Sequence, residues 1–167
     1  VAQQKTIVKV AGGTYGGFTA ANGVSVIGGF DQSFVANGPD GSNVVTVNAG
    51  AGAVAATISN LTLPITFKDL TLNGGGGVNA TGVLVVGSTV TFNGVTATSG
   101  AASGAGSSAY GIRAIDGSTV TVTDGSISAA AGVAGSSGAP GADGAAGAAG
   151  GNGTNGNGTG GAPINTA

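Results

Sequence analysis

Three eight-residue segments of the chain align without gaps, and this internal repeat restricts the possible folds more than any other feature. The segments are ITFKDLTL (65–72), VTFNGVTA (90–97) and VTVTDGSI (120–127), at offsets of 25 and 30 residues. Looser copies lie upstream, at 6–15, 23–30 and 43–48. A repeat of this length is typical of a solenoid, in which each repeat forms one coil that stacks on its neighbours.

Apolar and polar residues alternate within each copy, and this alternation indicates β-strands. In the second copy, Val90 and Phe92 flank Thr91, so the two apolar side chains fall on one face of a strand. A polar corner such as Asn93-Gly94 follows, and the alternation then resumes. The density of Val, Thr and Gly and the lack of a 3.6-residue period disfavour helix. The sequence therefore predicts an all-β solenoid.

Equivalent residues of stacked coils form columns, because neighbouring strands lie about 4.8 Å apart. The predicted interior columns are Ile65–Val90–Val120, Phe67–Phe92–Val122, Leu70–Val95 and Leu72–Ala97–Ile127.

The segment TIVKVAGGTYGGFTAANGVSVIGGFDQSF (6–34) resembles the opening of right-handed parallel β-helix domains of the pectate-lyase-like class. The later VTF-type coils resemble the rungs of that class, and the resemblance extends over roughly residues 5 to 128. It implies a single-stranded right-handed parallel β-helix of a surface or extracellular protein. It leaves the activity open, because the class includes polysaccharide lyases, hydrolases, adhesins and surface proteins without chemistry.

A glycine occupies every third position after the last coil, which predicts two domains: a parallel β-helix at 1–130 and a Gly-x-x low-complexity segment at 131–167. Collagen is disfavoured because it needs many prolines, and Pro140 is the only one in the run. Two interpretations stay open, a disordered segment or a polyglycine II-like strand whose glycine face lies against another backbone. The candidate packing face comprises Gly132, Gly135, Gly138, Gly141, Gly144, Gly147, Gly150, Gly153 and Gly156.

The composition disfavours several classes of function. The chain has four Lys and Arg residues among 167, too few for the basic stripe that binds nucleic acid. No stretch approaches the roughly 18 consecutive apolar residues of a membrane-spanning helix. Histidine and cysteine are absent, so the usual nucleophile triads cannot form. We therefore expect no nucleic-acid partner, no membrane span and no cofactor.

The acidic residues, all aspartates, are the remaining candidates for catalysis or metal binding. Asp69 and Asp124 fall in one column with Gly94 between them, which places them about 10 Å apart. That separation is just beyond the 6.5–9.5 Å or so of an inverting glycosidase pair. Asp before Gly or a small residue suits a left-handed corner. We therefore interpret both as corner residues and predict no catalytic or metal-binding residue and no enzymatic activity.

Threonines recur on the outward side of the strands, and two interpretations of them stay open. Threonine is a favourable outward strand residue, whereas an array of T-x-T on a flat β-face resembles the ice-binding surface of some antifreeze solenoids. The candidate outward positions are Thr66, Thr89, Thr91, Thr119, Thr121 and Thr123.

The ends of a solenoid expose unpaired backbone groups, which favours self-association. The sequence therefore predicts an exported, non-enzymatic structural protein of the cell surface or of an extracellular filament or layer, acting by self-association or adhesion. The opening VAQQKTIVKV suits a processed exported protein or an excised fragment, so we expect secretion or surface display. The alternatives are a carbohydrate-binding or carbohydrate-active β-helix module, with a surface glycan as partner, and an ice-binding protein.

Overall fold

The structure is a computed structural model that describes residues 6–35 and 43–153. The chain divides into two compact units, Val1–Ser136 and Ser137–Ala167. All strands lie in the first unit, and the described residues contain no helix, so the predicted all-β fold is confirmed. The strands are β1 (Ile7–Ala11), β2 (Gly13–Tyr15), β3 (Phe18–Thr19), β4 (Ser25–Phe30), β5 (Val45–Asn48), β6 (Ala56–Ser59), β7 (Ile65–Lys68), β8 (Thr71–Asn73), β9 (Ala80–Val86), β10 (Thr89–Asn93), β11 (Thr96–Thr98), β12 (Ala109–Ile115), β13 (Thr119–Thr123) and β14 (Ser126–Ser128).

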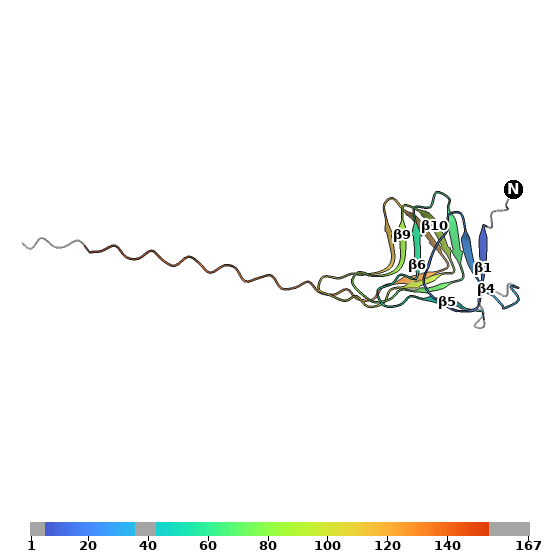
Figure 1. The fold of residues 1–167 in the computed structure, drawn as a ribbon, viewed down its shortest axis with the longest axis horizontal. Coiled ribbons are helices and arrows are strands. Elements are labelled where there is room, and N and C mark those ends of the chain that lie inside the picture. Colours follow the sequence, from blue (N-terminus) through green and yellow to red (C-terminus); the bar gives the residue numbers. More distant parts are fainter. Residues whose placement is uncertain (1–5, 36–42, 154–167) are drawn as a thin grey trace, which may run out of the picture. The chain divides into compact units, whose positions relative to one another are not determined.

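Three parallel sheets form the walls of a β-solenoid (Figure 1). Sheet A has the order β1-β4-β7-β10-β13, sheet B the order β14-β11-β8-β5-β2, and sheet C the order β12-β9-β6-β3. Each coil contributes one strand to sheets A, B and C in turn. The chain therefore completes four coils and adds two strands of a fifth, which confirms the predicted solenoid.

The register between the strands confirms three of the predicted interior columns in full. Strand β10 pairs with β7 and with β13, and β11 pairs with β8 and with β14. The aligned sets are Ile65–Val90–Val120, Phe67–Phe92–Val122 and Leu72–Ala97–Ile127. Leu70 and Val95, the fourth predicted set, are both buried in the same core.

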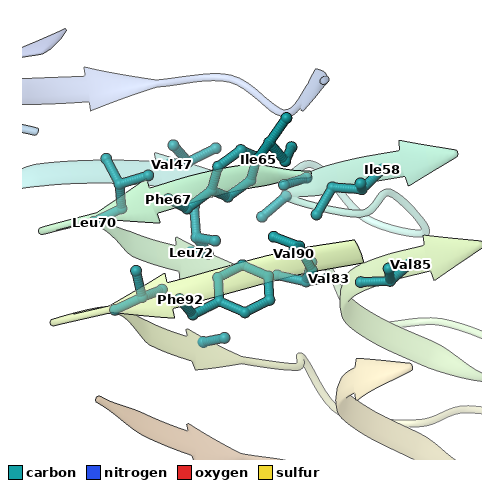
Figure 2. Close-up of a cluster of buried hydrophobic side chains, with 14 of the residues drawn as sticks. Val47, Ile58, Ile65, Phe67, Leu70, Leu72, Val83, Val85, Val90 and Phe92 are labelled. Carbon is teal, nitrogen blue, oxygen red and sulfur yellow. The ribbon is translucent and has the colours of Figure 1, made fainter. Parts of the chain in front are cut away.

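Aromatic rings run through the centre of this core. Phe67 and Phe92 are fully buried, and their ring centroids lie 5.6 Å apart in an edge-to-face arrangement (Figure 2). Phe18 of β3 adds a tilted ring at 5.6 Å from Phe67. Aromatic pairs of this geometry contribute about 0.5–1.5 kcal/mol beyond their buried area. The rings therefore link sheets A and C, and they come from the first, third and fourth coils.

Glycine-rich loops leave each coil between sheets B and C and stack on one another. The Gly52 N–H donates to the Gly76 carbonyl at 2.7 Å, and the Gly77 N–H donates to the Ala101 carbonyl at 3.0 Å. At Gly75, a Cβ atom would overlap the Gly50 carbonyl oxygen. These loops therefore pack backbone against backbone, and a side chain at Gly75 would separate two layers.

The central coils are expected to provide most of the stability. Phe92→Ala should lower the free energy of unfolding by about 3–5 kcal/mol, because it leaves a cavity among rigid neighbours. Thr91→Ala, the control on the outward side of the same strand, should cost no more than about 0.5 kcal/mol. Denaturant unfolding of both variants gives the comparison. Equal losses for the two variants would contradict the assignment of inward and outward faces.

Candidate interaction surfaces

The structure brings three of the predicted threonines into one outward column. Thr91 of β10 pairs with Thr66 of β7 and with Thr121 of β13. Thr89 pairs with Thr119, and Thr123 ends a mixed column that runs through Lys68 and Asn93. On sheet A, the T-x-T pattern therefore spans only β10 and β13.

These threonines differ in their access to solvent. Thr66 and Thr91 are half-buried. The other four, on β10 and β13, are exposed. The exposed hydroxyl groups therefore lie toward the C-terminal end of sheet A.

The Gly-x-x run begins inside the solenoid unit as a further layer of the loop stack. The Val133 N–H donates to the Ser107 carbonyl at 2.8 Å, and the Gly106 N–H donates to the Ala134 carbonyl at 3.0 Å. A Cβ atom on Gly132 would lie 3.1 Å from the Ser107 oxygen. At this point the glycine face does lie against another backbone.

The remaining glycines of the predicted packing face differ from Gly132. Gly135 has open space at its Cβ position. The six from Gly138 to Gly153 belong to the second unit, in which the residues described are exposed and form no strand. Gly156 lies outside the described residues. The assignment of a packing face therefore stays a prediction for all glycines after Gly132.

The left-handed corner expected at Asp69 and Asp124 is confirmed. Asp69, Gly94 and Asp124 have φ angles of 53°, 62° and 51°, and they follow one another on neighbouring coils. The Asp69 carboxylate also forms an ion pair with Lys68. Non-glycine residues adopt this conformation at a cost, and Asp and Asn tolerate it best. Both aspartates therefore have a structural explanation in the backbone conformation of the corner.

Sequence reasoning missed a second left-handed corner. Asn60, Gly87 and Asp116 have φ angles of 52°, 51° and 55° at the end of three successive sheet C strands. The signal was present, since the segments around Gly87 and Asp116 align once one residue is inserted.

Asp31 also serves a turn, because its Oδ1 accepts the N–H groups of Ser33 and Val35 at 2.9 Å. Asp40 lies outside the described residues.

An apolar cavity of about 480 Å³ opens at the N-terminal end of the solenoid. Its walls come from β1 to β3 and from the coil above them, and they include Val8, Val10, Phe18, Val26 and Val47. Val8 is 47% exposed. The first coil therefore leaves the interior accessible, a feature that sequence reasoning did not find.

The interior is also accessible at the C-terminal end of the solenoid. Val122 and Ile127 are 40% and 41% exposed, although Phe92 and Ala97 in the same columns are fully buried. Residues 129–134 do not cover them, because they follow the loop stack, where the Ala130 N–H donates to Ser99 Oγ at 3.0 Å. The last coil therefore presents an apolar face and two strand edges.

Comparisons with family models, with curated proteins and with solved structures find no match for this chain. Within residues 6–35 and 43–153, no three His, Cys, Asp or Glu side chains gather in a way that could hold a metal ion. The same residues contain no helix with the length and apolar character needed to cross a membrane.

The corner geometry at Asp124 predicts an unusual order of stabilities. Asp124→Gly should leave the free energy of unfolding within about 0.5 kcal/mol of the parent protein, because glycine adopts positive φ without strain. Asp124→Ala should lose about 1–2 kcal/mol, the cost of a left-handed conformation for an ordinary residue. Thermal unfolding of the two variants measures the order. A loss of stability in both variants, together with stabilisation of the parent protein but of neither variant by calcium, would instead assign the carboxylate to ion binding.

Proposed function

We propose that this chain is an exported, non-enzymatic structural protein of the cell surface or of an extracellular filament or layer, and that it acts by self-association. The observation that carries the proposal is the state of the two solenoid ends. Interior columns that are fully buried at Phe92 and Ala97 are 40% and 41% exposed at Val122 and Ile127. At the other end, the cavity beside Val8 is accessible as well.

Burial of these end residues gives a physical driving force for association. Covering apolar surface contributes roughly 25 cal/mol per Å², and the unpaired strand edges gain hydrogen bonds at the same time. Parallel strands in a regular stack accept another strand without a change of geometry. Self-association therefore uses the same contacts that hold one coil on the next.

The aspartates support a structural role over a catalytic one. Asp69, Asp116 and Asp124 each occupy a left-handed corner, and Asp69 is paired with Lys68. Asp31 accepts two backbone N–H groups of its own turn. Each of these residues thus has a role in the backbone path. The resemblance to pectate-lyase-like β-helices is compatible with this role, since that class includes surface proteins without chemistry.

The Gly-x-x segment is proposed to extend the assembly, either as a spacer or as a strand that packs on glycine-rich backbones. The contact between Gly132 and Ser107 supports the second role, because it repeats the packing of the loop stack.

Self-association is tested by electron microscopy and sedimentation velocity of the full chain across a concentration series. The proposal predicts species that grow with concentration. A protein that stays monomeric at every concentration contradicts it.

A glycan array run in parallel tests the carbohydrate-binding alternative, for which the Arg113 guanidinium 5.3 Å from the Tyr110 ring centre is the specific observation. Tight glycan binding by a strict monomer would favour that alternative.

Ice binding is the remaining alternative, and the aligned column Thr66–Thr91–Thr121 is the observation in its favour. We expect no thermal hysteresis from the protein, because the T-x-T pattern on sheet A is complete on only two strands. Hysteresis that disappears in both Thr91→Ala and Thr121→Ala would instead assign the threonine column to ice.

A further inference from the structure

We propose that the two ends of the solenoid bind each other, so that the last coil of one copy stacks on the first coil of a second copy. This inference rests on the proposed self-association and names the partner surface. The relevant surfaces are the N-terminal end, made by β1, β2 and the cavity beside them, and the C-terminal end, made by β13 and β14.

The interior columns continue from one end to the other. Val8 aligns with Val26, which aligns with Phe67 and, through Phe92, with Val122. A second column runs from Tyr15 through Val47, Leu72 and Ala97 to Ile127.

A second copy placed in register would therefore continue both columns. Val122 of one copy would meet Val8 of the next, and Ile127 would meet Tyr15. All four side chains are between 40% and 47% exposed in the single chain. The stacked coil would also cover the mouth of the 480 Å³ cavity. The contact thus buries the apolar surface of both ends at once.

The strand edges overlap in this register. Residues 7–9 of β1 would lie opposite 121–123 of β13, and 14–15 of β2 opposite 126–127 of β14. Short parallel ladders can therefore continue across the junction in sheets A and B. Sheet C has one strand fewer than sheets A and B, so one strand position stays open between β12 and β3 of the next copy.

Charge favours the pairing of unlike ends. Lys9 lies on β1, in the column that runs through Ile27 and Lys68 to Asn93 and Thr123. A second copy stacked in register would place its Lys9 beside Thr123, next to Asp124. Inside the solenoid, Lys68 and Asp69 form an ion pair at the equivalent positions. Two N-terminal ends would instead bring two Lys9 side chains together, and their strands would run antiparallel.

Contact between unlike ends is heterologous, and it produces an open chain of copies unless the rotation closes a ring. It also predicts how two end variants behave together. Val8→Asp places a charge at the N-terminal end and leaves the C-terminal end intact, whereas Val122→Asp does the reverse. Both positions are partly exposed, so a single copy accepts the charge in water.

The experiment measures mass by light scattering for each variant alone and for an equimolar mixture, with thermal unfolding as the check on folding. Each variant alone should remain monomeric at concentrations at least about tenfold above the assembly threshold of the parent, because a charge without a partner would be buried at the junction. The mixture should form a dimer and stop there, because each variant contributes one intact end. Val78→Asp, a control at a 73% exposed position in the loop between β8 and β9, should assemble like the parent.

The outcomes separate this inference from the proposed function. A parent protein that does not assemble contradicts both. Assembly of the parent that neither end variant impairs contradicts only the inference and places the contact on the flanks. Dimers formed by one variant alone mean that like ends pair, which also overturns the inference. If either aspartate variant fails the unfolding check, the serine variant at the same position, Val8→Ser or Val122→Ser, replaces it. The serine variant should also raise the concentration needed for assembly, but by less than the aspartate variant.

Discussion

Every coil of the solenoid is joined to the next by parallel backbone hydrogen bonds, and these ladders determine where each side chain lies. Because β10 pairs in register with β7 and β13, residues 90–93 each have an equivalent on both neighbouring strands. A favourable side chain is thereby repeated as a column, as the rings of Phe67 and Phe92 show. Coils remain superimposable only if the corners repeat too. The left-handed residues at Asp69, Gly94 and Asp124 meet this requirement.

The same regularity explains why the ends are the surfaces that we propose to associate. A coil in the middle of the stack has a partner on both sides, whereas the first and last coils have one partner each. Side chains that are fully buried in the middle are therefore partly exposed at Val8 and Val122. The two ends are also complementary, because they are the two sides of one repeating layer.

Much of the fold was predictable because the eight-residue segments of the last three coils align without gaps. The column that contains Phe67 and Phe92 and the left-handed corner at Asp69 follow directly from an ungapped alignment. The contribution of Phe18 and the corner at Asn60 did not follow. In the first coils the repeat is loose, and between Gly87 and Asp116 it is interrupted by one inserted residue. The N-terminal cavity could not be predicted from the sequence either, since it depends on how far side chains of different strands extend into a shared space.

For the Gly-x-x run, the sequence left two interpretations open, and the structure distinguishes them only at its beginning. Gly132 packs on the backbone at Ser107 because the loop stack supplies an adjacent layer there. A glycine at every third position defines a face, but what lies against that face depends on neighbouring layers. Local sequence therefore does not specify its partner.

The central claim is that copies stack along the axis of the solenoid, and the repeat distance of the assembled protein tests it most directly. Sheet A contains five strands. At about 4.8 Å per strand, each copy should advance the assembly by about 24 Å. Fibre diffraction or electron cryomicroscopy of assembled protein should therefore give a spacing of about 4.8 Å along the long axis, together with a subunit repeat of about 24 Å. A 4.8 Å spacing perpendicular to that axis would mean that copies associate through their flanks, and it would contradict the account.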